Sequence, residues 1–474
     1  MLDGASNGRS RDWLKWGLPL ATLAGTSLYY RFRPQPEGIN GINYSYRVPS
    51  ENIRFFHDSV WYEGSERRCI RQITPELIRM IRDANQFVVM DMFLFCLHHA
   101  SRSRDLIPTT RQIVDAFASR DRPAWFITDP LNIMYGTAVS PPIRWLEEAG
   151  VHVCVVDLNQ LRENNLIYAP LWRLGLRWIP TDVGPWFRNP LEAFSQTTPW
   201  AILEGILARA NHRKLVIADD GDSHLTMVTS SNFEDSSCYF ANTGVTIRST
   251  PVARHFLEAE KAVARISGLE IPVELPLERS EGDARVTPLM GNQIKEALLE
   301  VIENATPRDY LFLFTQYLSE RDLIEALVRA SERGVPGTLV LDQNLVSFGN
   351  PKSGFPNQLT APEMARRTRF EIRWANTRSE EFHNCFTLLH RPDRCILIAG
   401  SANYTRRGLS NTVLEANVRI EAACNTQVCL DALEYVHWLI EEPHSLPYSH
   451  IETDYYWPKY WLHRFLEATG SGTS

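Results

Sequence analysis

Short apolar runs alternate with amphipathic stretches along most of this chain of 474 residues. In the first half, the apolar runs cover residues 87–96, 124–128 and 151–156. Each run has the length and composition of a strand that is covered on both faces. Thr74 as N-cap and Pro75 at the first position predict a helix that continues to residue 81. Strands that alternate with helices predict a layered α/β domain.

The second half repeats this order of elements. A helix is expected around residues 294–302 and another over residues 323–330, with strands at 310–314, 338–341 and 370–374. The same order twice in one chain indicates two related domains. We place the first repeat at residues 50–270 and the second at residues 285–446.

Two stretches also repeat one pattern of polar residues. The first holds His212, Lys214, Asp219, Ser230 and Asn232, and the second holds His383, Ser401 and Asn403. The two histidines are 171 positions apart, and so are the two asparagines. The same shift places Gly244 opposite Glu415. A constant shift predicts an internal duplication with no gap between the histidine and the last marked position.

These residue types suit displacement at a phosphodiester. Such a reaction needs a nucleophile, an acid for the leaving oxygen, and donors around the phosphoryl oxygens. One imidazole can attack phosphorus and form a phosphohistidine, while a second imidazole carries the proton. Lys214 supplies a positive charge, and neutral donors to the same oxygens come from Ser230, Asn232, Ser401 and Asn403. Each repeat offers half of this set, so we expect the site at their interface.

The pattern His-x-Lys-x4-Asp followed by Ser-x-Asn resembles the motif of the phospholipase D superfamily. Residues 400–409 resemble its cardiolipin synthase and phospholipase D-like branch, and the whole resemblance covers residues 50–445. It implies two α/β/α sandwich repeats related by a pseudo-two-fold axis, with the active site between them. It also implies catalysis by His212, Lys214, His383 and Glu415, with Asp219 in support and no metal or other cofactor. Arg406 and Arg407 fit either an anion site or a solvated helix face.

The two copies of the motif are unequal. Cys385 stands where the second copy should have its lysine, and His390 stands where it should have its aspartate. We expect His212, beside Lys214, to be the nucleophile, and Glu415 to orient His383. The alternative is that the lost lysine marks a decayed, non-catalytic repeat.

The first repeat contains an insertion at about residues 160–205. Matching residue 87 to residue 310 gives a shift of 223 positions, which exceeds the 171 at the motifs by 52. The insertion interleaves arginines with Tyr168, Trp172, Trp178, Trp186, Phe187, Phe194 and Trp200. This mixture fits contact with a membrane interface, stacking on nucleic-acid bases, or a loop that fills a local core. The aromatic tail at residues 447–474 fits the same surface or a packed helix.

The N-terminal segment, residues 1–38, contains fifteen uncharged residues from Trp16 to Tyr30 and ends in a linker at residues 33–38. As a helix this stretch is about 22 Å long, which is shorter than a hydrocarbon core of about 30 Å. It therefore fits a signal anchor, a cleaved signal peptide or an interfacial helix. We expect it to associate the protein with a membrane, as at the inner membrane of a bacterium.

Composition narrows the choice of partner. The net charge of −7 and the absence of a basic run argue against nucleic acid, because proteins that track phosphates usually have a basic face. The eight cysteines contain no Cys-x2-Cys pair of the metal-binding type, and their scatter favours free thiols.

Together these features predict a membrane-associated phosphatidyltransferase or phospholipase D, similar to cardiolipin synthase, that uses phospholipid as its substrate. The alternatives are a phosphodiesterase or nuclease with the same chemistry, and a catalytically weakened lipid-binding protein.

Overall fold

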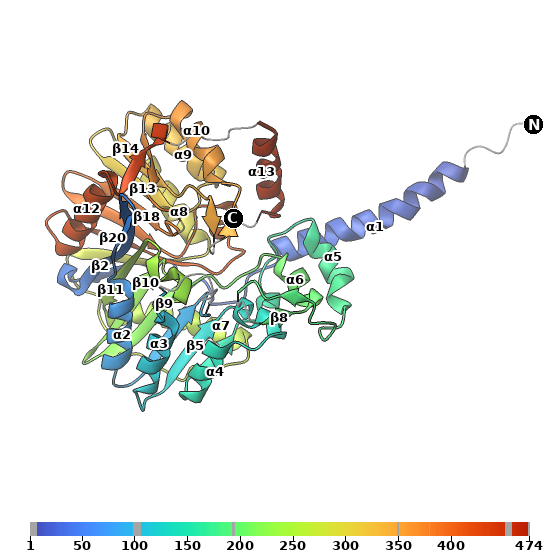
Figure 1. Ribbon diagram of the computed structural model, residues 1–474, viewed down its shortest axis with the longest axis horizontal. Helices are drawn as coiled ribbons and strands as arrows, with labels where there is room; N and C mark the ends of the chain where they lie inside the picture. The colour runs from blue at the N-terminus through green and yellow to red at the C-terminus, as the bar shows by residue number, and fades with distance from the viewer. Residues whose placement is uncertain are drawn as a thin grey trace, which may run out of the picture.

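The structure is a computed structural model that describes residues 7–97, 106–191, 195–347, 350–378, 380–450 and 457–472. Two large mixed sheets form its body, one built from the first half of the sequence and one from the second half with an added N-terminal strand (Figure 1). Helices lie on the outer faces of both sheets, so the molecule is built of alternating α and β layers. The predicted α/β fold class is confirmed.

The first sheet has eight strands in the order β3-β2-β11-β10-β9-β4-β5-β6. They are β2 (Ile53–Glu63), β3 (Glu66–Ile70), β4 (Val88–Met92), β5 (Ala124–Thr128), β6 (His152–Val155), β9 (Lys214–Asp220), β10 (Ser223–Thr229) and β11 (Asn242–Arg248). β4, β5 and β6 are parallel to one another, and β9 is antiparallel to β4. The three parallel strands coincide with the apolar runs of the sequence.

The second sheet has nine strands in the order β1-β12-β20-β19-β18-β13-β14-β17-β21. They are β1 (Tyr46–Val48), β12 (Ala284–Met290), β13 (Tyr310–Thr315), β14 (Gly337–Leu341), β17 (Glu371–Ala375), β18 (Cys385–His390), β19 (Arg394–Gly400), β20 (Ala416–Ala423) and β21 (Ser445–Pro447). Lys214 on β9 pairs with Met92, and Cys385 on β18 pairs with Thr315. The pairing reproduces both shifts read from the sequence, 171 positions and 223 positions.

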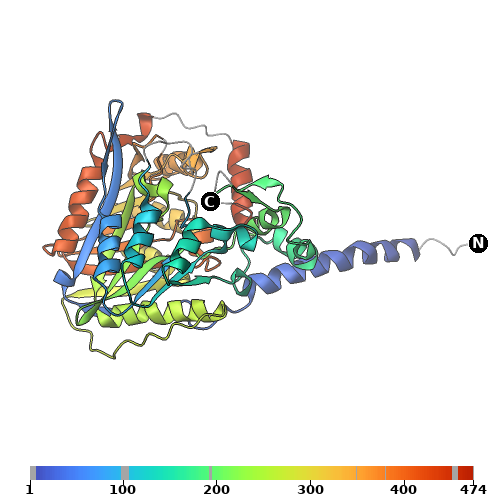
Figure 2. The same cartoon turned by 60° about the horizontal axis from the view of Figure 1, so that its bottom comes forward.

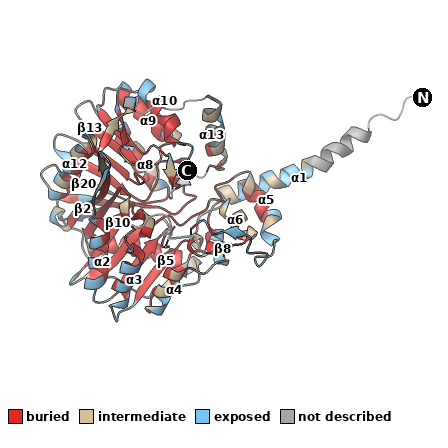
Figure 3. Cartoon of the chain, viewed as in Figure 1, coloured by how far each residue is buried: buried red, intermediate tan, exposed pale blue. Residues whose placement is uncertain are grey.

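Helices on the outer faces close two separate cores. The first sheet is covered by α2 (Ile73–Asp83), α3 (Thr109–Ala118) and α4 (Pro141–Glu148). The second sheet is covered by α8 (Asn292–Glu303), α9 (Arg321–Glu332) and α10 (Asn357–Arg367). A third core joins the inner faces of the two sheets with α7 (Thr250–Ile266) and α12 (Gln427–Ile440). Burial is therefore continuous from one repeat to the other (Figure 3).

The first helix of the first repeat begins differently from the prediction. Thr74 is not its N-cap, because α2 already starts at Ile73. A buried carboxylate on β2, Asp58, accepts hydrogen bonds from the backbone N–H groups of Gln72 and Ile73 at 2.7 and 3.0 Å. These bonds satisfy donors that a local cap would otherwise cover. The cap comes from a neighbouring strand, so local sequence does not reveal it.

The insertion folds as a small layer at one end of the molecule. It contains α5 (Tyr168–Leu174), α6 (Pro199–Gly205) and a hairpin of β7 (Phe187–Arg188) and β8 (Gln196–Thr197). Trp172 is buried and packs against Trp200, with 5.4 Å between ring centroids. Trp178 and Trp186 are 72% and 68% exposed. The aromatics thus divide between a local core and a surface, while Phe194 lies outside the described residues.

The two ends of the chain meet this insertion. α1 (Asn7–Phe32) projects from the body beside α5, and α13 (Trp457–Thr469) lies on the same side (Figures 1 and 2). Ser27 Oγ donates to the Leu166 carbonyl at 2.7 Å, and the Leu166 N–H donates to the Thr469 carbonyl at 2.8 Å. No helix in the described ranges is both long and apolar enough to cross a membrane. The remaining short elements are β15 (Val346–Ser347), β16 (Asn350–Pro351) and α11 (Arg406–Leu409).

Candidate active site

Both predicted histidines lie just before a central strand, where the two repeats meet. His212 precedes β9 and His383 precedes β18. Two parallel bridges join the repeats at these points, Asn211 to Leu414 and Phe382 to Ala241. Glu415 directly follows Leu414 and contacts His212. In the same way, Asn242 directly follows Ala241 and contacts His383. The partners of each imidazole are therefore crossed between repeats.

His212 contacts a carboxylate and an ammonium group. Its Nδ1 lies 2.9 and 3.0 Å from the two carboxylate oxygens of Glu415, and its Nε2 lies 3.1 Å from Lys214 Nζ. Burial lowers the pKa of His212, while Glu415 raises it and Lys214 lowers it. An imidazole whose Nδ1–H donates to Glu415 presents the lone pair of Nε2. This tautomer is the one that attack on phosphorus requires.

His383 has an amide partner instead. Its Nδ1 lies 3.1 Å from Asn242 Oδ1, and since an amide oxygen only accepts, this nitrogen carries the proton. Burial holds the pKa of His383 well below its usual value, and the nearby Lys214 and His212 lower it further. The prediction that Glu415 orients His383 is wrong, because Glu415 contacts His212.

Asn242 is the structural counterpart of Glu415, and Gly244 is not. The Ser230 N–H donates to the Thr243 carbonyl at 2.9 Å, and the Ser401 N–H donates to the Ala416 carbonyl at 3.0 Å. The shift between Thr243 and Ala416 is 173 positions, two more than between the serines. The prediction of an ungapped repeat therefore fails after the serines. A gap of two residues conceals Asn242 when the copies are aligned without one.

The two motif serines hold the partners of the histidines. Ser401 Oγ donates to a Glu415 carboxylate oxygen at 2.5 Å, and Ser230 Oγ donates to Asn242 Oδ1 at 3.2 Å. Both serines are completely buried, and neither lines the cavity described next. We expected them to bind phosphoryl oxygens directly. Their hydroxyl protons are already engaged, so we assign them a positioning role.

His212 and His383 line one cavity of about 260 Å³ between the repeats. Asn232, Asn403 and Arg407 add polar groups to the same cavity. The apolar part of its wall contains Phe93, Leu94, Leu131, Tyr135, Leu191 and Ala210. Two imidazoles, two carboxamides and a guanidinium can together surround a phosphodiester.

Of the two arginines that the sequence left open, Arg407 lines the cavity, whereas Arg406 donates to backbone carbonyls at the end of α13. Phe93 was not anticipated. Its ring lies 4.6 Å from the His212 ring and 5.3 Å from Lys214 Nζ, measured to the ring centroids. Phe93 continues the apolar run that forms β4, and an apolar residue in such a run carries no sequence signal for a site.

Lys214 and Cys385 make the site asymmetric. Lys214 is completely buried, and burial lowers the pKa of its ammonium group to about 8. Cys385 Sγ donates to Asn403 Oδ1 at 3.5 Å, and burial raises the pKa of this thiol. The cations at the site are therefore Lys214, which is buried beside His212, and Arg209 and Arg407, which line the cavity. Arg209 is paired with Glu204, and Cys385 contributes an uncharged thiol.

Asp219 lies at the other end of β9. Its carboxylate accepts the backbone N–H groups of Asn85, Gln86 and Phe87 at 2.8–3.0 Å, which fixes the turn before β4. Five strand steps separate it from Lys214, a distance of about 17 Å. Asp219 therefore holds β9 against the turn before β4. Its counterpart in the second copy, His390, lies near Cys395 and Cys424.

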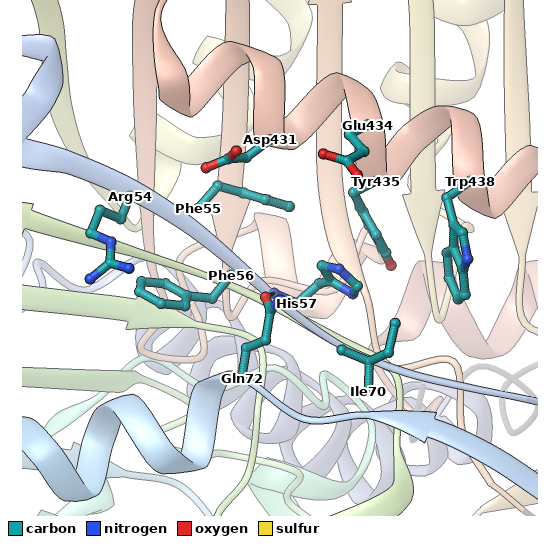
Figure 4. Close-up of a pocket in the computed structure, with 10 residues that line it drawn as sticks. All are labelled: Arg54, Phe55, Phe56, His57, Ile70, Gln72, Asp431, Glu434, Tyr435 and Trp438. Carbon is teal, nitrogen blue, oxygen red and sulfur yellow. Dashed lines mark hydrogen bonds between the residues drawn. The ribbon is translucent and has the colours of Figure 1, made fainter.

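A second cavity of about 460 Å³ lies between β2 and α12 (Figure 4). His57 and Tyr435 stack within it, with 4.5 Å between ring centroids, and Trp438 lines the same wall. Burial lowers the pKa of His57 to about 4, so this imidazole is neutral at pH 7. Neither motif histidine lines this cavity. The chemistry predicted from the motifs therefore belongs to the smaller cavity.

Comparisons with known proteins relate part of the chain to a family and most of it to a known fold. Residues 298–436 match the family model of the cardiolipin synthase, PLD-like domain. Phosphatidylserine synthase of Haemophilus influenzae Rd KW20 aligns with a TM-score of 0.57 and 12% identity, over 92% of this chain and 96% of that chain. No curated protein matches the chain.

Two other solved structures align less well. Polyphosphate kinase of Porphyromonas gingivalis has a TM-score of 0.46 and 12% identity, over 88% of this chain and 53% of its own. Nuc of Salmonella typhimurium, a phospholipase D family member, has a TM-score of 0.26 and 15% identity, over 34% of this chain and 98% of its own. The cardiolipin synthase, PLD-like family model thus matches part of the second half of the chain, and the likeness to the Haemophilus influenzae enzyme shows a shared fold over nearly the whole chain.

Proposed function

We propose that the protein is a phosphatidyltransferase or phospholipase D that acts on phospholipids at a membrane surface, in the manner of cardiolipin synthase. The observation that carries this proposal is the shared cavity of His212 and His383, which lie 171 positions apart in the chain. Its volume suits a phosphodiester and the atoms that adjoin it. Its apolar wall, which includes Leu131, Tyr135 and Leu191, suits the carbon atoms next to a lipid phosphate.

In the first step, His212 Nε2 attacks phosphorus and the bond to the leaving alcohol breaks. His383 donates a proton to the departing oxygen, which leaves a phosphohistidine. The negative charge of Glu415 stabilises the positive charge that the phosphorylated imidazole acquires. In the second step, His383 removes a proton from water or from an incoming alcohol. That oxygen attacks phosphorus, and the P–N bond breaks.

The phosphodiester anion itself assists this cycle. The low pKa of His383 arises from burial and from two cationic or ionisable neighbours, Lys214 and His212. A bound phosphate brings a negative charge into the same cavity and raises that pKa, which favours the protonated acid. Arg407 and the carboxamides of Asn232 and Asn403 then surround the phosphoryl oxygens. Lys214, buried with its Nζ 3.1 Å from His212 Nε2, adds a positive charge behind them.

A surface suited to a membrane interface lies next to the cavity. Trp178 and Trp186 of the insertion are largely exposed, and so are Leu28 and Tyr29 of α1 and Trp461 of α13. Arg177 and Arg188 of the insertion are exposed beside these aromatics. Amphipathic aromatics mixed with arginine suit the boundary between headgroups and acyl chains, especially where anionic lipids are present. We propose that this surface brings the cavity to the lipid.

Defined lipids test the proposal directly. Purified full-length protein is mixed with phosphatidylglycerol vesicles or, separately, with single-stranded DNA, and the products are identified by mass spectrometry. We expect phosphatidic acid or cardiolipin from the vesicles and intact DNA. Cleavage of DNA alone would replace the proposal by a nuclease, and no turnover of either substrate would favour a lipid-binding protein without activity.

Replacing Lys214 by alanine is expected to lower kcat about 10²–10³-fold, the usual effect of losing one preorganised donor to a transition-state oxygen. Cys385→Ala is the matched control, because it changes the corresponding position of the other repeat without removing a charge. The control should keep most of the wild-type rate. If both changes lowered kcat equally, Lys214 would not have a catalytic role that Cys385 lacks.

The pH dependence of the same residue extends this test. A p-nitrophenyl phosphodiester needs no acid for its leaving group, so formation of the phosphoenzyme, the step that kcat/KM reports, does not depend on the proton of His383. Lys214 is a cation below its pKa of about 8, so kcat/KM should fall as the pH rises through this value. Lys214→Arg should move this fall to higher pH, because guanidinium keeps its proton. An unmoved profile would argue against Lys214 as the titrating group.

The docking surface gives a separate prediction. Replacing both Trp178 and Trp186 by alanine should weaken binding to phosphatidylglycerol vesicles about 10-fold or more, because each large apolar side chain contributes about 1.5–3 kcal/mol when buried. Co-sedimentation measures this. Leu430→Ala is the control, since Leu430 is exposed on α12 at the opposite side of the molecule (Figure 1). Equal binding of the double variant and the control would show that this surface does not contact lipid.

A further inference from the structure

A group of thiols and one imidazole lies at the outer end of the second sheet. Ligand atoms of His390, Cys395 and Cys424 all lie within 4.8 Å of one another. A fourth residue, Cys429, shares a hydrogen bond with Cys395 through their thiols. All eight cysteines of the chain lie in its described parts and are free thiols. Three thiols and an imidazole form one of the common ligand sets of structural zinc sites.

The topology explains why these residues meet. His390 ends β18 and Cys395 lies near the start of β19, and the two are opposite each other across this hairpin. Cys395 also pairs with Ala422 on β20, and Cys424 follows the end of that strand. Cys429 lies in the first turn of α12, with its Sγ 3.6 Å from the Ala422 carbonyl oxygen. Strand ends of the second sheet therefore bring three ligands together, and α12 places Cys429 against one of them, Cys395.

The separation of the sulfur atoms fits a metal better than it fits a disulfide. Cys395 Sγ and Cys424 Sγ are 3.9 Å apart. Two thiolates on a tetrahedral zinc ion, each about 2.3 Å from it, are about 3.8 Å apart. A disulfide requires about 2.05 Å. The two sulfurs already have the spacing of ligands around an ion.

Access and surroundings also fit. His390 and Cys424 are half-buried, so an ion can reach the group from solvent, while Cys395 and Cys429 are buried. Arg391 and Arg394, in the turn of the hairpin, are paired with Asp309 and Asp393.

We propose that His390, Cys395, Cys424 and Cys429 bind one structural zinc ion. Binding releases the three thiol protons to solvent, and His390 coordinates through the lone pair of one ring nitrogen. The site is separate from the active site, because β18 runs about 17 Å from Cys385 to His390. It ties the β18–β19 hairpin to β20 and α12, and these strands lead directly to His383, Ser401 and Glu415.

The site also accounts for a departure in the second motif. Asp219 of the first repeat fixes the turn before β4 through three backbone N–H groups. Its counterpart His390 has the same position on β18 but belongs to the thiol group. A metal ion bound by His390 can hold the outer end of β18 in place, as Asp219 holds the outer end of β9.

Metal analysis of the purified full-length protein tests this proposal. After dialysis against a weak chelator under reducing conditions, we expect about one zinc per chain by mass spectrometry. Replacement by Co²⁺ should give the visible absorption bands of tetrahedral thiolate coordination. Cys424→Ser should weaken zinc binding more than 100-fold, beyond the 10–100-fold that loss of a supporting outer residue costs. Cys154→Ser, which changes a buried thiol of the first repeat, should keep the zinc.

A rescue variant separates ligation from folding. Cys424→His keeps a ligand at a half-buried position, so it should retain zinc and the cobalt spectrum in a shifted form. Absence of zinc and of the cobalt bands in the wild type would overturn the proposal. So would a disulfide between Cys395 and Cys424 in protein purified without reductant, detected by peptide mapping. Neither readout depends on catalytic activity, so the zinc site stands or falls separately from the proposed function.

Discussion

Replacement of His212 by alanine is expected to lower kcat on phospholipid by about 10⁴–10⁶-fold, the range observed when a covalent nucleophile is removed. The physical reason is that no other described side chain lining the cavity combines an unprotonated imidazole nitrogen with a carboxylate that stabilises the charged intermediate. Turnover of phosphatidylglycerol vesicles, measured by product mass spectrometry, gives the rate. Circular dichroism checks that the variant is folded.

A p-nitrophenyl phosphodiester separates the two histidines. Its leaving group departs without a proton, so His383→Ala should still form the phosphoenzyme and should accumulate it, because the base for the second step is missing. His212→Ala should form none. Acid-labile phosphate on the protein, mapped by mass spectrometry, distinguishes the two variants. A phosphoenzyme in His212→Ala that maps to His383 would reverse the two roles.

Glu415→Gln should have the second largest effect, a loss of about 10³–10⁴ in kcat. In a serine protease, neutralising the carboxylate behind the catalytic histidine lowers kcat about 10⁴-fold, and the two arrangements share the same logic. Glu415 is buried, bonded to His212 Nδ1 and to the Ser401 hydroxyl. Glutamine keeps the volume, but it loses the charge that balances the phosphorylated imidazole. It can also donate where the wild-type residue only accepts.

Glu421→Gln is the matched control for this change. Glu421 lies on the same strand, β20, and pairs with Arg419 near the outer end of the sheet. Its replacement should leave kcat near the wild-type value. If Glu415→Gln lowered kcat by less than about 10-fold, the carboxylate would not stabilise the reacting imidazole. The role proposed for the contact between Glu415 and His212 would then be wrong.

The fold could be predicted from the sequence because its signals are local and repeated. The apolar runs predict the parallel strands, and the strand pairing contains both of the shifts, 171 and 223 positions, on which the predicted duplication rests. The motif also identified both histidines that share the cavity. The start of α2 cannot be predicted from local sequence, because the side chain that caps it, Asp58, lies on strand β2 and not next to the helix in the chain.

The details of the site depend on contacts between repeats, which spacing does not encode. Glu415 belongs to His212 because Leu414 forms a bridge with Asn211, a pairing of residues about two hundred positions apart. Asn242 was hidden by a gap of two residues. The ligands of the proposed zinc site come from four elements, so the search for a Cys-x2-Cys pair could not find them.

The crossed partners of the two histidines have a consequence for how such a chain can evolve. An ancestral half-length chain could complete its imidazoles only by pairing with an identical copy, and both copies then had to keep every residue. Fusion into one polypeptide removed that constraint. Each half of such a chain can differ from the other, and here one half has the ammonium of Lys214 and the amide of Asn242, while the other has the carboxylate of Glu415 and the thiol of Cys385.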